Sequence, residues 1–394
     1  MTRSRLVHSI AAGATLVAAA LASGASAQET VKLGLSVPLS GAAANWGLGS
    51  EFMCDTAAKE IAAAGGVKVG DTTYNFECVA YDNKYNASEG TKVAQTLLNR
   101  DGIKIIGGSL GTAPVQALQT LAERQGALIF TTAWGKSLKG PKHPTTFTQM
   151  NTPHEILPLL IPFVVEQHPD AKTVAMLSPN DATGKETEAV AQTVWKEHGV
   201  EVLTSDFYER GTTEFRPIAS KIAALEPAII DLGSTPPADA GAIFKELDVL
   251  GWDGVKVVEV GTGIEGIKAT GGDTVEGTYM GAAVTFDGDS VPQHMKDVNA
   301  AARAEIGESI NAIHIGFYDS VFALKAAMEK AQSTDPAALA EVMPDVTFPA
   351  FYGSEVGFGS ADVYGTPQQM QLPVIVTQIV DGKLVEKARL TPKR

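Results

Sequence analysis

One short string in the sequence has the spacing of a nucleophilic site. Residues 107–111, Gly-Gly-Ser-Leu-Gly, fit the G-x-S-x-G pattern in which a serine hydrolase exposes its nucleophile between a strand and a helix. Asp287 and His314 follow in the order that such an enzyme needs, but His314 lies within a predicted helix. The other interpretation is a glycine-rich turn whose N–H groups face an anion at a helix N-terminus. A hydrolase that uses Ser109 is therefore kept as an alternative only.

Three turns between a predicted strand and the next helix are rich in Gly, Ser and Thr. They cover residues 40–47, 109–113 and 131–135, and two of them contain a tryptophan, Trp46 or Trp134. Ligands of an open α/β sheet bind beyond the carboxyl ends of the strands, so we expect the turns to meet at one crevice. Hydroxyls, N–H groups at helix ends and two indoles suit an anionic group on an apolar body. No general acid or base is evident there, which argues against an enzyme.

Other sequence patterns typical of cofactor or metal sites lack the residue spacing that such sites require. Residues 135–137, Gly-Lys-Ser, end like a phosphate-binding loop, but Phe130 stands where its first glycine is required. The seven histidines show no spacing typical of metal ligands. We therefore expect no cofactor and no metal.

The strands and helices that would position these turns are indicated by short apolar runs that alternate with helical patterns along the chain. This alternation runs from residue 31 to residue 130, starts again after residue 151 and continues to residue 260. Repeated strand–helix units are typical of a mostly parallel sheet covered by helices, so two series predict two α/β lobes. The last hundred residues do not continue the second series cleanly. We expect the chain to return there to the earlier lobe.

The composition narrows the possible partners. The chain has 394 residues, with 45 acidic and 31 basic side chains and a formal net charge of −14. Nucleic-acid binding requires a basic face, so we expect no nucleic-acid partner.

The first 27 residues have the pattern of a secretory signal peptide. Arg3 and Arg5 precede an uncharged apolar run over residues 10–22, and residues 25–27, Ala-Ser-Ala, provide the small side chains that precede a cleavage site. The apolar run is too short to span a bilayer, and no later stretch approaches the length required. We expect cleavage after Ala27 and an exported protein that is not embedded in the membrane.

Export allows Cys54 and Cys78 to pair, because it places them in an oxidising compartment. They lie on consecutive predicted elements, a helix over residues 52–64 and a strand over residues 74–81. A disulfide between them would contribute about 3 kcal/mol to stability. Two buried free thiols are the alternative.

Several motifs resemble those of one family. The matching segments are residues 38–41 (Pro-Leu-Ser-Gly), Gly47, 61–66 (Ile-Ala-Ala-Ala-Gly-Gly), 81–82 (Tyr-Asp), 107–114 and 318–319 (Tyr-Asp). Over nearly the whole mature chain the sequence resembles the solute-binding proteins of the leucine/isoleucine/valine-type ABC importers, a branch of the type I periplasmic binding proteins. The resemblance implies an α/β fold of two Rossmann-like lobes, with parallel sheets flanked by helices and three hinge crossovers. It also implies a periplasmic location.

The resemblance also implies the division of the chain and its function. The N-terminal lobe would comprise residues 28–149 and 283–356, and the C-terminal lobe residues 150–282 and 357–394. The lobes would close over a small solute and deliver it to the membrane permease of an ABC importer. A periplasmic ligand sensor of the same fold is the alternative. The family also tends to carry a disulfide between the first helix and the second strand, which Cys54 and Cys78 fit.

Nine ligand-binding residues follow from the resemblance, position by position. They are Trp46, Gly111, Thr112, Ala133, Trp134, Gly135, Thr183, Thr235 and Glu259.

Departures from the family pattern leave the ligand open. Gly111 replaces the usual serine of the carboxylate clamp, so Thr112 would supply the hydroxyl, and Thr183 and Thr235 stand where amino-acid-binding members have tyrosines. The glutamate that meets the amino group should fall near Gly261, two positions after Glu259. Without a carboxylate, an ammonium group would lose its hydration uncompensated. The ligand is therefore either a branched-chain or other hydrophobic amino acid, met by Glu259 or Asp181, or an aromatic or aliphatic carboxylate without an ammonium group.

Overall fold

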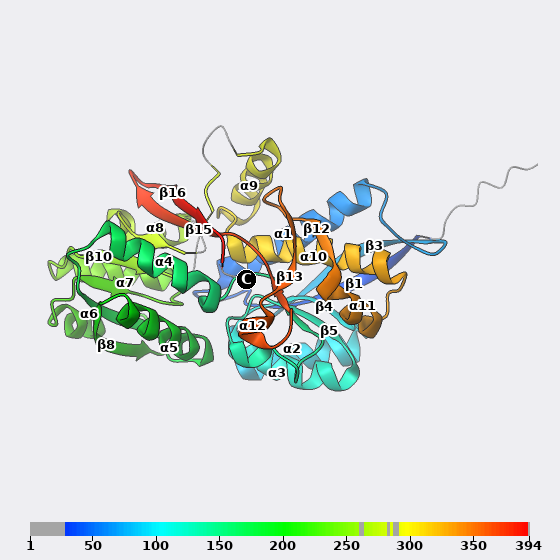
Figure 1. Cartoon of the computed structure of the whole chain (residues 1–394), viewed down its shortest axis with the longest axis horizontal. Coiled ribbons are helices and arrows are strands. Elements are labelled where there is room, and N and C mark those ends of the chain that lie inside the picture. Colours follow the sequence, from blue (N-terminus) through cyan, green and yellow to red (C-terminus); the bar gives the residue numbers. More distant parts are fainter. Residues whose placement is uncertain (1–27, 260–263, 282–283, 287–290, 393–394) are drawn as a thin grey trace, which may run out of the picture.

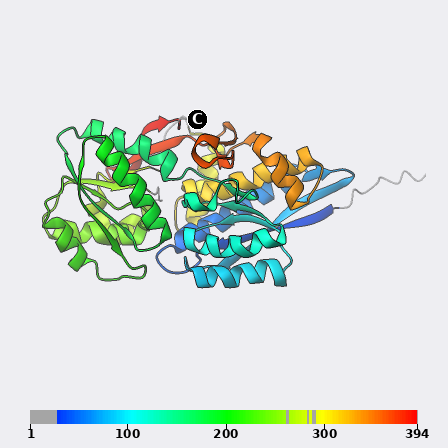
Figure 2. The same cartoon turned by 60° about the horizontal axis from the view of Figure 1, so that its bottom comes forward.

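Two α/β bodies lie side by side in the computed structural model, each built around one sheet (Figures 1 and 2). The structure describes residues 28–259, 264–281, 284–286 and 291–392. The expected signal peptide, Asp287 and Gly261 lie outside the described residues.

The first lobe contains a nine-stranded sheet in the order β12-β13-β14-β6-β5-β4-β1-β3-β2. Its central strands, from β3 to β14, run parallel, whereas β2, β13 and β12 pair antiparallel with their neighbours. The strands are β1 (Gln28–Val37), β2 (Val67–Val69), β3 (Thr72–Asp82), β4 (Ile105–Ser109), β5 (Leu128–Thr131), β6 (Thr146–Thr148), β12 (Thr347–Pro349), β13 (Glu355–Gly359) and β14 (Gln369–Met370).

The second lobe contains a seven-stranded sheet in the order β16-β15-β11-β10-β9-β7-β8. The strands from β8 to β11 are parallel, and β15 and β16 form an antiparallel pair at the edge. The strands are β7 (Thr173–Pro179), β8 (Glu201–Tyr208), β9 (Ile229–Asp231), β10 (Val255–Val258), β11 (Tyr279–Met280), β15 (Val374–Val380) and β16 (Lys383–Leu390). The two parallel-dominated sheets confirm the expected fold class.

Helices flank both sheets. Those of the first lobe are α1 (Ala44–Ala63), α2 (Ala87–Gln95), α3 (Thr112–Ala122), α9 (Gln293–Ile306), α10 (Ala312–Ala331), α11 (Pro336–Val342) and α12 (Ala361–Tyr364). Those of the second lobe are α4 (Pro153–Gln167), α5 (Ala182–Glu197), α6 (Arg216–Ala223), α7 (Pro237–Val249) and α8 (Ile264–Gly271).

Local sequence explains where the helices nearest the site begin. The Asp181 carboxylate accepts a hydrogen bond from the Gly184 N–H at 2.9 Å and so caps α5. The Asn311 side chain caps α10 in the same way, and Thr152 with Glu155 forms a capping box at the start of α4. These caps fix the helix ends that face the other lobe.

The chain changes sheets three times, as the expected crossovers require. The first change lies between β6 and α4, and the second lies between β11 and α9. The third differs from the expected boundary after residue 356, which lies inside β13. Because β13 pairs with β14, and β14 pairs with β6, the chain leaves the first sheet only after Met370. The short segment between Met370 and Val374 is the third crossover.

Cys54, on α1, and Cys78, on β3, are joined by a disulfide, with their Cα atoms 6.3 Å apart. The bond fastens the first helix to a strand beside β1. The two cysteines are therefore a local crosslink within the first lobe.

Candidate ligand-binding site

A small cavity lies between the lobes at the ends of the strands. It is lined by Trp46, Tyr85, Leu110, Gly111, Thr132, Ala133, Trp134, Thr183, Ser234 and Ile313. The first lobe contributes turns after β1, β3, β4 and β5 and the start of α10, and the second lobe contributes Thr183 and Ser234. The cavity volume is about 20 Å³, which is room for little more than one water molecule. A solute can enter only if the lobes separate.

The wall of the cavity is mostly aromatic and aliphatic. Trp46 is 2% exposed, and its ring lies 6.1 Å from that of Tyr85 between centroids. Trp134 is also buried. The Trp46 Nε1 atom is buried without a hydrogen-bond partner among the described residues, although an indole N–H normally has one. This indole N–H is thus a buried donor without a partner, on a residue that lines the cavity.

Thr112 and Thr183 connect the two lobes beside this cavity. The Thr183 hydroxyl oxygen accepts a hydrogen bond from the Thr112 N–H at 3.0 Å and donates to the Thr112 hydroxyl at 2.9 Å. The Thr112 hydroxyl in turn accepts from the Gly135 N–H at 3.2 Å. The N-terminus of α3 is therefore satisfied across the cleft by a side chain of α5.

Gly111 makes this approach possible, because its φ of +92° lies in the region that favours glycine. A Cβ atom there would lie 2.9 Å from the Pro114 ring and 3.2 Å from the Tyr85 ring. A larger residue would displace both α3 and the wall of the cavity.

Two further contacts close the cleft. Glu186, on α5, accepts hydrogen bonds from the Lys136 N–H at 2.7 Å and the Ser137 hydroxyl at 3.1 Å. Arg210, which follows β8, stacks over the Tyr85 ring at 3.8 Å and is paired with Asp181 at 2.5 Å. Asp181 therefore serves as a helix cap and an ion-pair partner, and it does not line the cavity.

Seven of the nine predicted residues lie at the cleft. Five of them line the cavity, whereas Thr112 and Gly135 lie directly behind it in the hydrogen-bonded chain. Thr235 and Glu259 do not reach the cavity. The Thr235 hydroxyl faces the Leu177 carbonyl at 3.5 Å, and its neighbour Ser234 lines the wall instead, with its Oγ unpartnered among the described residues.

Glu259 belongs to a buried group of three carboxyl groups within the second lobe. Its neighbours are Asp231, which accepts hydrogen bonds from the Trp195 indole at 2.8 Å and the Gly233 N–H at 2.9 Å, and Glu188. Burial, followed by the charge of Asp231, raises the pKa of Glu259 well above its ordinary value. Burial also raises the pKa of Glu188 to about 8. Burial beside two other carboxyl groups therefore disfavours the charged form of Glu259, and its side chain does not line the cavity.

The position of Ser109 argues against a serine hydrolase that uses this residue as its nucleophile. Its side chain is fully buried and its hydroxyl donates to the Phe130 carbonyl at 3.0 Å. The neighbouring Gly108 allows α10 to approach the sheet, because a Cβ there would lie 2.1 Å from the Phe317 ring. The His314 ring packs against Gly49 of α1 and accepts a hydrogen bond from the Asn311 N–H. The G-x-S-x-G string is a packing feature.

Five lining residues are not among the nine predicted ones: Leu110 and Thr132, which lie within the expected turns, and Tyr85, Ser234 and Ile313, which do not. Tyr85 follows β3 and Ser234 follows β9, so the rule about carboxyl strand ends, applied to every strand, would have found both. Ile313 lies in the first turn of α10, and no local pattern indicates its contact with the distant turns.

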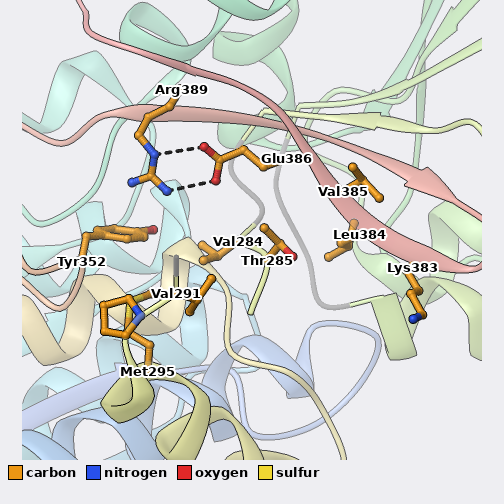
Figure 3. A pocket seen from close by; sticks show the side chains of 11 residues that line it. Val284, Thr285, Val291, Met295, Tyr352, Lys383, Leu384, Val385, Glu386 and Arg389 are labelled. Atoms are coloured by element: carbon orange, nitrogen blue, oxygen red, sulfur yellow. Dashed lines mark hydrogen bonds and ion pairs between the residues drawn. The ribbon is translucent and has the colours of Figure 1, made fainter. Parts of the chain in front are cut away.

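A larger cavity, of about 770 Å³, shares no lining residue with the small one (Figure 3). Residues near α9 face β16 across it, including Met295 on one side and Leu384 on the other, with the ion pair of Glu386 and Arg389 above (Figure 3). It includes none of the predicted site residues.

Among the described residues, no group of acidic, histidine or cysteine side chains could hold a metal ion. Within that same part of the chain, no helix is long and apolar enough to cross a membrane.

Two lobes with parallel sheets and a cavity between their strand ends define a type I periplasmic binding protein, and comparison with known proteins agrees. Residues 30–383 match the periplasmic binding protein family, to which this chain therefore belongs. This confirms the resemblance seen in the sequence. The relatives are binding proteins, as expected for a chain that is not an enzyme.

Individual relatives differ in what they bind. The leucine-, isoleucine-, valine-, threonine- and alanine-binding protein of Pseudomonas aeruginosa is 24% identical over 336 residues, which is 85% of this chain and 87% of that protein. A leucine-binding protein from Thermotoga maritima has a similar fold, with a TM-score of 0.76 and 18% identity over 92% of this chain and 99% of that one. A solute-binding protein from R. palustris in complex with benzoate also has a TM-score of 0.76, with 15% identity over 92% and 97% of the two chains.

Proposed function

We propose that this protein is the solute-binding component of an ABC importer, and that it captures a small apolar carboxylate between its lobes and delivers it to the membrane permease. The observation that carries the proposal is the aromatic cavity at the junction of the lobes, beside the α3 N-terminus. When the lobes separate, Thr183 leaves Thr112, and the N–H and hydroxyl of Thr112 become available to a carboxylate.

The charge distribution favours a ligand without an ammonium group. No acidic side chain lines the cavity among the described residues, and residues 260–263 are Val-Gly-Thr-Gly, which carry no charge. Glu259 is buried inside the second lobe, where burial raises its pKa well above the ordinary value, and it does not line the cavity. An ammonium group bound here would lose its hydration without a carboxylate partner. An aromatic or aliphatic carboxylate fits the wall of Trp46, Tyr85 and Trp134 better than an amino acid does.

The binding energy would come from the closed form, because only there does a ligand touch both lobes. The relative in complex with benzoate provides a precedent within this fold for an aromatic carboxylate.

The test compares ligands that differ only in the amino group. Thermal unfolding would be measured with 3-phenylpropanoate against L-phenylalanine, and with 4-methylpentanoate against L-leucine. A ligand at 100 times its dissociation constant adds about 2.7 kcal/mol of stability. In each pair, we expect the carboxylate without the amino group to stabilise the protein more than the corresponding amino acid does. Stabilisation by the amino acids alone would contradict the ligand class, and binding unaffected by Trp46→Ala and Trp134→Ala would contradict the site.

A further inference from the structure

A buried carboxylate forms a further connection between the two lobes, through other residues than the contact of Thr183 with Thr112. Glu308 lies between α9 and α10 of the first lobe and is 2% exposed. Its Oε2 accepts a hydrogen bond from the Asn45 side chain at 2.8 Å, within the first lobe. Its Oε1 accepts from the Gly266 N–H at 3.2 Å, in the first turn of α8 of the second lobe. One carboxylate therefore joins the ends of two helices from different lobes.

The contact depends on the first turn of α8. Peptide N–H groups at the start of a helix have no partner within the helix, and a carboxyl oxygen can accept from one of them whether or not the group carries a proton. A Cβ at residue 266 would lie 3.1 Å from the Glu308 Oε2 and 3.4 Å from the Asn45 Nδ2, so glycine leaves room for the carboxylate. If the lobes part, the Gly266 N–H and Glu308 both lose this contact and become hydrated.

A second set of bonds accompanies the first. Glu265, also in the first turn of α8, accepts hydrogen bonds from the Ser309 N–H at 3.2 Å and the Ser309 hydroxyl at 3.1 Å. Arg303, on α9, forms an ion pair with Glu265 at 2.6 Å. Two carboxylates and one guanidinium therefore meet where α8 approaches the first lobe.

The contact adjoins the ligand cavity through α1. Asn45 immediately precedes Trp46, whose ring forms part of the cavity wall. Glu308 therefore contacts the same end of α1 that forms part of the wall of the proposed ligand cavity.

We propose that Glu308 is a proton-linked latch, which takes up a proton as the lobes close and so makes closure depend on pH. The proposal concerns regulation of the proposed ligand site, but closure itself can be measured without a ligand.

The surroundings of Glu308 determine the direction in which its pKa shifts in the closed form. Burial raises the pKa of Glu308 to about 7; the Gly266 hydrogen bond opposes this shift and the neighbouring Glu265 adds to it. The Asn45 hydrogen bond and the charge of Arg303 also lower it. His314, which contacts the backbone of Asn45, has its pKa lowered to about 3 by burial and so stays neutral near pH 7.

In the open form the carboxyl group is hydrated, with a pKa of about 4.3. Between pH 5 and 7 the closed form therefore binds more protons than the open form, by nearly one near pH 6 and by about one half at pH 7. Lower pH favours closure, and this advantage is lost as pH rises through 7.

The matched control is Asp319, on α10. Burial raises its pKa to about 7 as well, but its partner is the Phe351 N–H at 2.7 Å, within the first lobe. Opening of the cleft leaves Asp319 buried. Asp319→Asn should therefore change the pH dependence of folding without changing that of closure.

The experiment measures closure and binding from pH 6 to pH 8. Small-angle scattering without added solute should show a larger radius of gyration at pH 8 than at pH 6 in the wild type. Affinity for a carboxylate identified by thermal unfolding, such as 3-phenylpropanoate, should fall about tenfold over the same range, as one linked proton predicts. Glu308→Gln should remove both effects, and Asp319→Asn should retain both.

Asn45→Ala provides a second variant. It removes one hydrogen bond to the carboxylate, so the pH at the midpoint of closure should rise. A Glu308→Gln protein that keeps the wild-type pH response, or an Asp319→Asn protein that loses it, would overturn the latch. The scattering result decides this even if no tested carboxylate binds, in which case the proposed function fails separately.

Discussion

The Thr183 hydroxyl of the second lobe lies 3.0 Å from the Thr112 backbone nitrogen of the first lobe. The same hydroxyl accepts from the Tyr85 hydroxyl at 3.3 Å. A hydroxyl of the protein thus occupies the position at the α3 N-terminus to which we assign the ligand carboxylate. Solute and Thr183 compete for one N–H group.

Thr183→Val should shift the protein toward the open form. Valine has a similar shape but cannot accept from the Thr112 N–H, and a buried N–H without a partner costs about 1 to 3 kcal/mol. Small-angle scattering without added solute should show a larger radius of gyration. Thr193→Val, at an exposed position of α5, is the control and should leave the scattering unchanged. Equal curves for Thr183→Val and wild type would contradict a closing role for this contact.

Trp46→Phe tests the unpartnered indole N–H. Phenylalanine retains an aromatic wall but removes the donor, and a hydrogen bond to a charged group contributes about 1.5 to 3 kcal/mol. Affinity for a bound carboxylate, measured by calorimetry, should fall at least tenfold, with little change in stability. Trp252→Phe removes an indole hydrogen bond to the Pro227 carbonyl, far from the cavity, and should leave affinity unchanged. A similar loss in both variants would rule out a direct contact by Trp46.

Replacement of both Cys54 and Cys78 by serine should lower the free energy of unfolding by about 3 kcal/mol, because the unfolded chain gains freedom. Denaturant unfolding measures the change. Dithiothreitol should destabilise the wild type by a similar amount and leave the double variant unaffected. Ligand affinity should be retained, since neither residue lines the cavity. A double variant as stable as the oxidised wild type would contradict this contribution.

Glu188→Gln should make stability less dependent on pH. The folded-state pKa of Glu188 is raised to about 8, above the unfolded value of about 4.3. The stability that this group contributes is therefore fully present below pH 4 and is lost as pH rises toward 8. This one group contributes a slope of about 1.4 kcal/mol per pH unit between pH 5 and pH 7.

Denaturant unfolding at pH 5, 6 and 7 would measure the slope. Glu188→Gln should reduce it, whereas Glu166→Gln, at an exposed position of α4, should not. The same slope in all three proteins would show that Glu188 is ionised in the folded lobe.

Much of the first-lobe site could be predicted from the sequence, because it depends on a local rule. Parallel strands bring their carboxyl ends to one edge, so turns that contain Trp46, Gly111 and Trp134 had to be neighbours. The second lobe was harder. A shift of one residue in a strand-end turn decides which side chain faces the cleft, and so Ser234 lines the cavity while Thr235 does not.

The edges of the sheets were also harder to predict. β16 alternates exposed positions with buried or partly buried ones and carries several charges, so it lacks the apolar run that marked the central strands. β14 has only two residues, yet it determines where the chain leaves the first sheet. Neither pairing follows from local pattern, because each depends on a strand distant in sequence.

The order of strands in the first sheet has a consequence for synthesis of the chain. β6 is complete at Thr148, but its outer neighbour β14 is made only at residues 369–370, after the entire parallel part of the second sheet. Until then the edge of β6 has unpaired backbone groups, which are a template for pairing with other chains. A nascent chain shorter than about 370 residues therefore cannot complete its first lobe. Truncation or stalling before that point would leave an aggregation-prone edge, even though nearly all of the ligand site had already been synthesised.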